Sequence, residues 1–415
     1  MAYDRGYDKA AAMRPLLFMP LLTTSYRNIF MLACCQALLL TNSAGLIAMN
    51  ALVGYSLVDT KMLATLGATT YVLGSALATM PMSLWMAKVG RRRGFMAGAL
   101  VNVLGCAIAV VALLQGSFAL YCVATAVIGI YNAVGLQYRF AATEVAAPAD
   151  KARAISLVLA GGIVGGFLGP AITRWGQHMF ATPFLGSFVM LAGVAVLALA
   201  VQSRVDVPKP SAEERAGGGR PLRDIIRQPV FIVAALSAGL GYGLMNLLMT
   251  ATPLAMSFCS LPYAQAALVI QWHVVGMYAP GFVTGSLIKR AGVLRIISAG
   301  VVLMGAGSLV ALNGVTVAHF VAALVLVGIG WNFMYTGGTT LLTEAYTPAE
   351  KARTQGANDF IVFSIMGVSS FSSGALVSAA GWEVMNWGAL PILVLIAAVV
   401  AWFARQRAAK AIPAV

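Results

Sequence analysis

The sequence predicts an all-α polytopic membrane protein, with twelve transmembrane helices in two six-helix bundles related by a pseudo-twofold axis. Of the 415 residues, 60% are hydrophobic and only 10% are charged, and the mean hydropathy is +0.86. A water-soluble fold of this composition would expose too much apolar surface. Apolar runs of about 20 residues, enough to cross a bilayer as a helix, recur along the chain. An internal repeat divides these runs into two halves.

The predicted spans follow from hydropathy and from the turn residues between the apolar runs. They cover residues 29–53, 63–87, 94–115, 119–141, 154–174, 183–203, 230–257, 263–288, 295–313, 318–342, 354–379 and 387–404. The expected order is a cytoplasmic segment (1–28), an N-terminal bundle (29–203), a cytoplasmic linker (204–229), a C-terminal bundle (230–404) and a cytoplasmic tail (405–415). The linker is assigned from its proline, glycine and charge content.

The distribution of positive charge predicts the orientation. All of the 27 basic residues except Lys61 and Arg174 lie in alternate loops or at the termini. Positively charged loops stay in the cytoplasm, so we expect both termini to be cytoplasmic. Because the net charge of +14 is spread over these loops, it does not indicate nucleic-acid binding.

Two related segments reveal the internal repeat. TEVAAPADKARA (143–154) matches TEAYTPAEKART (343–354), and SLWMAKVGRRRG after the second span has a counterpart, GSLIKRAGVLR, after the eighth. Both pairs occupy equivalent places in the two halves. Duplication of this kind is typical of transporters built from two repeated bundles.

With these repeats and spans, the sequence resembles the major facilitator superfamily over nearly its whole length. That superfamily has a glycine–acid–basic signature in its second-to-third loop, and Lys88, Gly90, Arg91 and Arg92 match its basic part, whereas the acidic position is Ala87. The resemblance implies a cytoplasmic gate, for which the candidates are Arg91, Arg92, Glu144, Glu344 and Asp359. Asp359 is the candidate acid for Arg91 or Arg92; the alternative is a carboxylate at the membrane interface without a special partner.

The fifth predicted span is rich in glycine. Its small residues are Gly161, Gly162, Gly165, Gly166 and Gly169, followed by Pro170. Such residues allow two helices to approach closely. The run also resembles an antiporter signature of the superfamily, but Arg174 and Trp175 stand where that signature has further glycines. We therefore favour a packing role over an antiport role.

A possible metal site lies in spans seven and eight. Met245 and Met249 are four residues apart, as are His273 and Met277, and residues with this spacing share a helix face. Measured from the turn near Ser260, Met249 and His273 lie at similar depths of roughly 17–18 Å. Thioethers and a neutral imidazole suit Cu(I), whereas Mg²⁺ or Ca²⁺ would require oxygen ligands.

Ordinary core packing is the competing interpretation of the methionines. Met82 and Met86 have the same spacing near the end of span two, and methionine commonly fills gaps in hydrophobic cores. The histidine carries more weight, because an ionisable residue inside the membrane is a functional candidate by default.

The M-x-x-x-M and H-x-x-x-M pairs resemble those of the CcoA-type bacterial copper importers, a branch of the major facilitator superfamily. The resemblance implies that Met245, Met249, His273 and Met277 bind copper. It also implies a thiol role for Cys259, for which an inert small side chain is the equal alternative. We expect the cavity wall opposite this set to include Met49 and Asn50 of the first span. Two amides of the C-terminal half, Asn246 and Asn332, are further candidates for the wall.

The resulting expectation is a monomeric, secondary-active copper importer of the bacterial inner membrane. It would carry a copper ion or small copper chelate inward by alternating access and supply cytochrome oxidase assembly. We expect no enzymatic activity, no bound cofactor and no nucleic-acid partner, and the absence of a G-x-x-x-x-G-K-[ST] motif argues against ATP drive.

Two alternatives remain open from the sequence. The first is a carrier for a small organic molecule such as a vitamin or drug, with a pocket formed by Tyr242, Asn246, Trp272, Trp331, Asn332 and Tyr335. The second is a membrane copper receptor that does not transport the ion.

Overall fold

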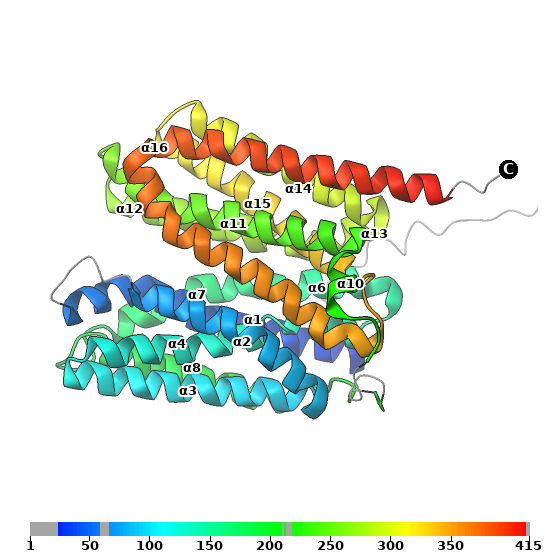
Figure 1. Ribbon diagram of the computed structural model, residues 1–415. Coiled ribbons are helices and arrows are strands. Elements are labelled where there is room, and N and C mark those ends of the chain that lie inside the picture. The colour runs from blue at the N-terminus through cyan, green and yellow to red at the C-terminus, as the bar shows by residue number, and fades with distance from the viewer. Residues whose placement is uncertain (1–23, 59–65, 210, 213–217, 412–415) are drawn as a thin grey trace, which may run out of the picture.

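The computed structural model describes residues 24–58, 66–209, 211–212 and 218–411. The predicted segment 1–28, the linker 204–229 and the tail 405–415 therefore lie partly outside the described residues. Within the described ranges, the regular elements are all helices, and they form two bundles that lie side by side (Figure 1). The predicted all-α membrane fold is confirmed.

The N-terminal bundle follows the predicted spans closely, because each apolar run forms one helix or two consecutive helices. It contains α1 (Thr24–Leu57), α2 (Leu66–Val89), α3 (Arg91–Gln115), α4 (Phe118–Gly135), α5 (Tyr138–Val145), η3 (Pro148–Asp150), α6 (Lys151–Ala160), α7 (Gly162–Gly176) and α8 (Leu185–Gln202). The fourth predicted span corresponds to α4 and α5, and the fifth corresponds to α6 and α7.

The C-terminal bundle begins after the short linker helix α10 (Leu222–Ile226). It contains α11 (Pro229–Phe258), α12 (Tyr263–Tyr278), α13 (Gly281–Ala291), α14 (Val293–Leu312), α15 (Val317–Leu342), η4 (Pro348–Glu350) and α16 (Lys351–Ala411). Gly381 divides α16 into two helices, because its φ of 83° and ψ of 168° are not helical. The two parts of α16 match predicted spans eleven and twelve.

Eleven helices of the described chain are long and apolar enough to cross a membrane. The predicted span that is missing from this set is the eighth, which the structure divides into α12 and α13. Pro280 lies at the break and cannot donate a backbone hydrogen bond. Ala279 and Pro280 nevertheless keep right-handed helical φ and ψ values.

The glycines of the fifth predicted span bring α7 against α1. A Cβ added to Gly165 would lie 2.4 Å from the Ala37 carbonyl oxygen, and one added to Gly169 would lie 2.6 Å from the Gly45 nitrogen. Only glycine permits this separation of the two backbones, which supports the packing role predicted for this run.

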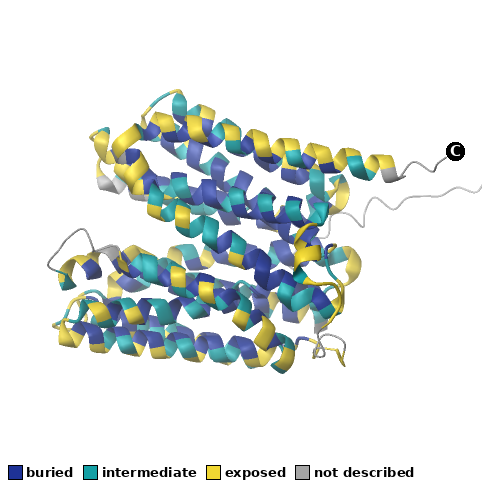
Figure 2. Cartoon of the chain, viewed as in Figure 1, coloured by how far each residue is buried: buried dark blue, intermediate teal, exposed yellow. Residues whose placement is uncertain are grey.

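Burial follows the bundle architecture. Buried residues line the interiors of the two bundles, and exposed residues cover their outer faces (Figure 2). Many exposed side chains on these faces are large and apolar; Phe371, for example, is 80% exposed. Such a surface suits lipid rather than water.

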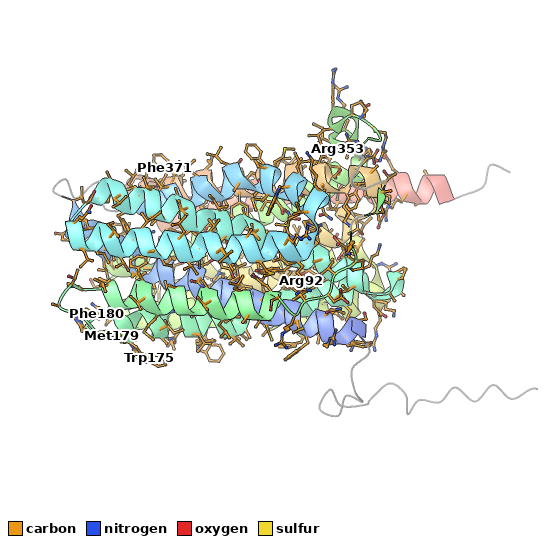
Figure 3. All side chains as sticks on the ribbon, turned by 90° about the horizontal axis from the view of Figure 1, so that it is seen from below. Arg92, Trp175, Met179, Phe180, Arg353 and Phe371 are labelled. Carbon is orange, nitrogen blue, oxygen red and sulfur yellow. The ribbon has the colours of Figure 1, made fainter. Side chains whose placement is uncertain are left out.

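Most of the positively charged loops gather at one end of the molecule, which we call the basic end. Arg92 and Arg353 lie towards this end, whereas Trp175, Met179 and Phe180 lie at the opposite end (Figure 3). The linker is held to both bundles here. The Asp206 backbone N–H donates to Asn28 Oδ1 (3.0 Å), and Arg220 forms an ion pair with the buried Glu350 (2.7 Å).

Candidate binding cavity

A cavity of about 100 Å³ lies between the two bundles. The N-terminal bundle lines it from α1, α2, α4, α5 and α6, and the C-terminal bundle lines it from α11, α12, α15 and α16. The side chains that carry its chemistry are Gln36, Ser43, Tyr71, Asn132, Arg139, Tyr242, Tyr278, Trp331, Tyr335 and Phe363. Because both bundles contribute, a ligand in this cavity would contact each of the two repeated halves.

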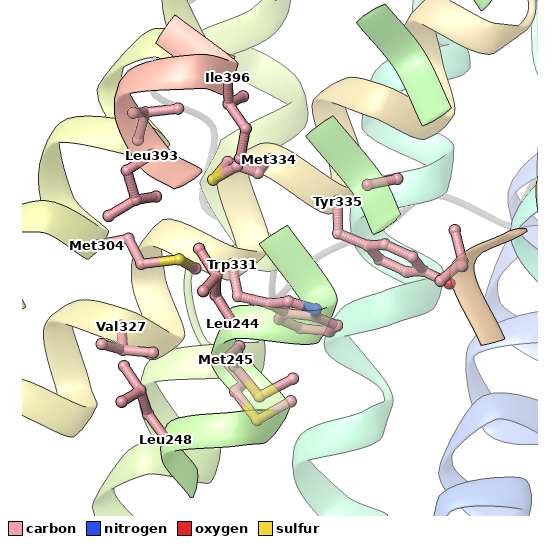
Figure 4. Close-up of a cluster of buried hydrophobic side chains, with 14 of the residues drawn as sticks. Leu244, Met245, Leu248, Met304, Val327, Trp331, Met334, Tyr335, Leu393 and Ile396 are labelled. Carbon is pink, nitrogen blue, oxygen red and sulfur yellow. The ribbon is translucent and has the colours of Figure 1, made fainter. Parts of the chain in front are cut away.

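The C-terminal side of the cavity is an aromatic wall, formed by Tyr242, Tyr278, Trp331 and Tyr335. The rings of Trp331 and Tyr335 are stacked, with centroids 5.1 Å apart and an interplanar angle of 14°. Tyr242 meets both of these rings edge-on, at 5.3 Å and 5.4 Å, and Tyr278 meets Trp331 at 5.7 Å. Figure 4 shows Trp331 and Tyr335 beside the apolar core of the bundle. Trp331, Tyr335 and Tyr278 are 1%, 3% and 6% exposed, so the wall is a closely packed and rigid cluster of large rings.

The N-terminal side of the cavity is more polar. The Tyr71 hydroxyl donates to Ser43 Oγ at 2.9 Å, and Asn132 Nδ2 donates to Ser75 Oγ at 3.2 Å. Gln36 also lines this side. These groups are hydrogen-bonded within their own bundle and can exchange hydrogen bonds with a polar ligand.

Arg139 lines the part of the cavity that is nearest to the basic end. Its guanidinium forms an ion pair with Asp359, donates to the Tyr335 hydroxyl and lies 4.6 Å from the centroid of the Tyr335 ring. Arg139 is 2% exposed and Asp359 is fully buried. A buried ion pair therefore joins α5 of one bundle to α16 of the other.

A second ion pair lies next to the first. Arg91 binds Glu144 through two nitrogens (3.0 and 2.8 Å), and Lys351 reaches the same carboxylate from the other bundle (3.0 Å). Arg91 also donates to Gln137 Oε1 (2.8 Å) and Gln355 Oε1 (2.7 Å). Together these residues form a charged layer across the bundle interface.

Gln137 connects this layer to the buried pair, since its Nε2 donates to Asp359 Oδ2 at 3.2 Å. We call the connected set the latch; it consists of Arg91, Gln137, Arg139, Glu144, Lys351, Gln355 and Asp359.

Further contacts close the same end. Ser83 Oγ donates to the Ala352 carbonyl oxygen at 2.7 Å, and Ser156 Oγ donates to the Gly281 carbonyl oxygen. In the described part of the chain, the hydrogen bonds and ion pairs between the bundles begin with Arg139 at the cavity and continue towards the basic end. The structure is therefore a conformation that is closed at the basic end.

Three of the five residues predicted for the cytoplasmic gate take part in the contacts between the bundles. Arg91, Glu144 and Asp359 belong to the latch, but the partner of Asp359 is Arg139 rather than Arg91 or Arg92. Arg92 is exposed on α3. Glu344 forms an exposed pair with Arg407 inside the C-terminal half. Only Glu144 of the two repeat-related glutamates therefore faces the other bundle.

Arg139 is one of the basic residues that the charge pattern assigns to the alternate loops, and it lies near the end of the fourth predicted span (119–141). One signal for a buried role was available, because Arg139 lies among aromatic and alanine residues in the segment YRFAA (138–142). Its partner Asp359 is 220 residues away, and no local pattern connects the two positions.

The four residues predicted to bind copper lie in the C-terminal bundle. Met245, His273 and Met277 are buried, and Met249 is partly buried. His273 Nδ1 lies 2.6 Å from the Leu324 carbonyl oxygen; because a carbonyl can only accept, Nδ1 carries the proton. Nε2 has no hydrogen-bond partner among the described residues.

Helix packing does not favour the expected facing of spans seven and eight. α12 packs mainly on α15, whereas α11 packs mainly on α16 and then on α15, and contacts between α11 and α12 are few. Met245 lies near Trp331 in the core of the bundle (Figure 4). The copper set remains a prediction, and it does not line the cavity described above.

The predicted wall residues also lie outside the cavity lining. Met49 is in the N-terminal core, and Asn50 accepts a hydrogen bond from the Tyr121 hydroxyl (3.0 Å). Asn246 donates to Ser369 Oγ (3.0 Å), and Asn332 donates to the Met277 carbonyl oxygen (2.7 Å). The amides of Asn246 and Asn332 are bonded inside the C-terminal bundle, whereas Asn50 is bonded through Oδ1 and its Nδ2 has no partner among the described residues.

Two further predicted residues lie away from the cavity. Cys259 is a partly buried free thiol at the end of α11. Trp272, one of the residues expected in an organic-solute pocket, is 50% exposed. Of that expected set, Tyr242, Trp331 and Tyr335 do line the cavity.

Comparison with known proteins identifies the family. The model of the Major Facilitator Superfamily matches residues 30–271 and 260–414. The chain is 40% identical over 377 residues to the riboflavin transporter RfnT of Brucella anthropi, which covers 90% of this chain and 95% of that protein. It is 27% identical over 383 residues to an uncharacterised transporter of this type, YddS of Bacillus subtilis, over 88% of each chain.

The fold agrees with solved transporter structures. The proton:xylose symporter XylE superposes with a TM-score of 0.77 at 13% sequence identity, covering 92% of this chain and 96% of that one. This similarity agrees with the sequence matches, with the two-bundle fold and with the cavity between the bundles. The chain belongs to the Major Facilitator Superfamily and is a membrane transporter rather than an enzyme.

Proposed function

We propose that this protein is a secondary-active importer of riboflavin or a closely related flat heteroaromatic vitamin. Two observations support the proposal. A riboflavin transporter is 40% identical over nine-tenths of the chain, and the cavity has an aromatic wall facing a polar one. This is the organic-solute alternative raised by the sequence, with its substrate class now narrowed.

The two walls match the two parts of riboflavin. Its planar tricyclic ring offers a surface that aromatic side chains stack on, and such stacking contributes about 1–3 kcal/mol per ring. Its carbonyl oxygens and ribityl hydroxyls need hydrogen-bond partners. The Trp331 indole N–H and Arg139 Nε have no partner among the described residues, and Gln36 and Asn132 line the opposite side.

The size of the cavity indicates how transport proceeds. Sites that enclose a drug-sized ligand measure roughly 300–1,000 Å³, whereas this cavity measures about 100 Å³. The bundles must therefore separate further before the vitamin can enter. Because the latch closes the basic end, we infer that entry takes place from the opposite end and that release follows opening of the latch.

We further propose that α12 and α13 together form a twelfth span and that the basic end is cytoplasmic. The second statement follows from the tendency of positively charged loops to remain inside the cell. With this orientation in the bacterial inner membrane, the present conformation is sealed towards the cytoplasm. It is the arrangement expected before an imported solute is captured.

Copper import is the second candidate function. The unpartnered Nε2 of His273, fixed as an acceptor by the bond to Leu324, is the observation that favours it. The relatives described above lend it no support, and the methionines near His273 have a sufficient role in core packing. Riboflavin import is therefore the better supported of the two.

Uptake measurements separate the candidates. We would express the wild type and His273→Ala in a riboflavin-auxotrophic bacterium, match the protein levels, and follow radiolabelled riboflavin and radioactive copper. We expect riboflavin accumulation above the empty-vector level for both proteins. Copper accumulation that requires His273, without riboflavin uptake, would instead establish copper import; accumulation of neither solute would refute both proposals.

A further inference from the structure

A cluster of basic side chains surrounds a recess at the basic end. Two adjoining cavities of about 640 and 580 Å³ share Arg92 and Asp206. Six exposed basic residues line them; these are Arg27, Lys88, Arg92, Arg93, Arg204 and Lys209. We call this region the basic recess.

The charge of the basic recess is poorly balanced. Arg91 also lines it, but this residue is neutralised in the latch by Glu144. Among the described residues that line the recess, Asp206 is the one acid. No ion pair in the described part of the chain joins any of the six basic residues to a carboxylate. Like charges that line one recess repel one another, and an anion bound in the recess would offset this repulsion.

The fold of the turn after α2 does not require Arg92. The equivalent turn in the second half has the same backbone, since Gly90 has φ 90° and ψ 156° and Gly292 has φ 89° and ψ 149°. At that turn, Leu294 stands in the place of Arg92. The same local structure therefore forms without the arginine, and its presence in the first half calls for a separate explanation.

The surface beside the recess is suited to an acyl chain. Along α3, Arg92 is followed at four-residue intervals by Met96, Leu100 and Leu104, which share a face near the charged end. Leu100 is 55% exposed and Leu104 is 56% exposed. On α8, which packs against α3, Val196 is 54% exposed. A charged recess thus continues into an apolar outer surface.

We propose that the basic recess binds the phosphate headgroup of an anionic phospholipid, with an acyl chain along the exposed faces of α3 and α8. Clusters of four to eight basic residues next to transmembrane helices attract anionic lipids. Free phosphate would satisfy the charge alone, whereas a lipid satisfies the charge and covers the apolar surface. The proposal does not depend on the identity of the transported solute.

Native mass spectrometry of the full-length protein in mild detergent tests the proposal. The probes are phosphatidylglycerol and phosphatidylcholine with identical acyl chains. For the wild type we expect phosphatidylglycerol to bind at least about tenfold more tightly, and we expect Arg92→Gln/Arg93→Gln to lose this preference. The matched control is Arg290→Gln/Arg295→Gln, which removes the same charge from the equivalent loop of the second half and should keep the preference.

Further variants and a soluble competitor make the result decisive. Arg204→Gln/Lys209→Gln removes charge from the other side of the recess and should also lose the preference, whereas Arg92→Lys/Arg93→Lys should keep it. Equal binding of the two lipids, or equal loss in the control variant, would overturn the site. Displacement of phosphatidylglycerol by millimolar inorganic phosphate would assign the recess to free phosphate and overturn the lipid.

Discussion

Arg139 connects the cavity between the bundles to the closed end of the molecule. Its guanidinium contacts the Tyr335 ring of the aromatic wall and pairs with Asp359 of the other bundle. Hydropathy placed Asp359 near the start of the eleventh predicted span but did not reveal its partner, because the pair forms only when the two bundles meet. The aromatic residues Trp331 and Tyr335 were predictable as pocket candidates, since each is a large amphipathic side chain inside a span.

Removal of one charge from the buried pair should have a large effect. Asp359→Asn leaves the Arg139 charge buried without its counter-charge, which typically costs about 3–5 kcal/mol. We expect a clear fall in the thermal unfolding temperature and loss of riboflavin uptake. The double variant Arg139→Gln/Asp359→Asn should unfold at a higher temperature than Asp359→Asn, because no lone charge remains.

The exposed pair of Glu344 and Arg407 supplies the matched control. Its side chains are 46% and 40% exposed, and exposed pairs contribute only about 0–1 kcal/mol. Glu344→Gln should therefore leave both unfolding and uptake nearly unchanged. Wild-type stability and uptake in Asp359→Asn would contradict the assignment of this pair to the latch.

At the scale of helices, the sequence predicted most of the fold. Apolar runs and glycine turns located the spans, because membrane helices must satisfy their backbone hydrogen bonds internally. The division of the eighth span at Pro280 was not anticipated, since hydropathy averages over a single proline. The buried amides Asn246 and Asn332 were expected at the cavity, but hydropathy does not show which face of a helix meets the cavity and which meets a neighbouring helix.

The contact of α7 with α1 gives a prediction at this scale. Gly165→Ala would place a Cβ 2.4 Å from the Ala37 carbonyl oxygen, and overpacking of this kind usually costs about 1–3 kcal/mol. We expect a lower unfolding temperature and less folded protein in the membrane. Gly193→Ala on α8 is the control, because a Cβ there has no atom within 4 Å and alanine favours the helix by about 0.5–1 kcal/mol. An equal effect of the two substitutions would contradict the close helix contact.

At the scale of the whole molecule, the bundles are joined at one end, and the proposed transport cycle requires them to part there. The duplication in the sequence predicted two bundles and a cavity between them. It did not predict the chemistry of the cavity walls, because that chemistry depends on residues from nine helices brought together by the fold. The methionine and histidine spacing suggested copper, whereas the assembled cavity is aromatic and polar.

A reversible cross-link tests the proposed separation of the bundles. A Cβ added to Gly356 would lie 3.3 Å from Ser83 Cβ, close to the 3.5–4.5 Å typical of disulfides. Ser83→Cys/Gly356→Cys should form a disulfide under oxidation, stop riboflavin uptake, and regain uptake after reduction. Ser83→Cys alone is the control for the native cysteines. Full uptake by the fully cross-linked protein would show that the basic end need not open.

The central claim, that the aromatic wall binds riboflavin, is tested most directly by riboflavin binding to the purified protein, followed by quenching of riboflavin fluorescence. We predict saturable binding to the wild type and a Kd about tenfold higher for Trp331→Ala, because loss of about 1.4 kcal/mol of stacking corresponds to that change. Trp272→Ala removes a half-exposed tryptophan and should leave the Kd unchanged. Absence of saturable binding, or the same Kd for Trp331→Ala as for the wild type, would contradict the account.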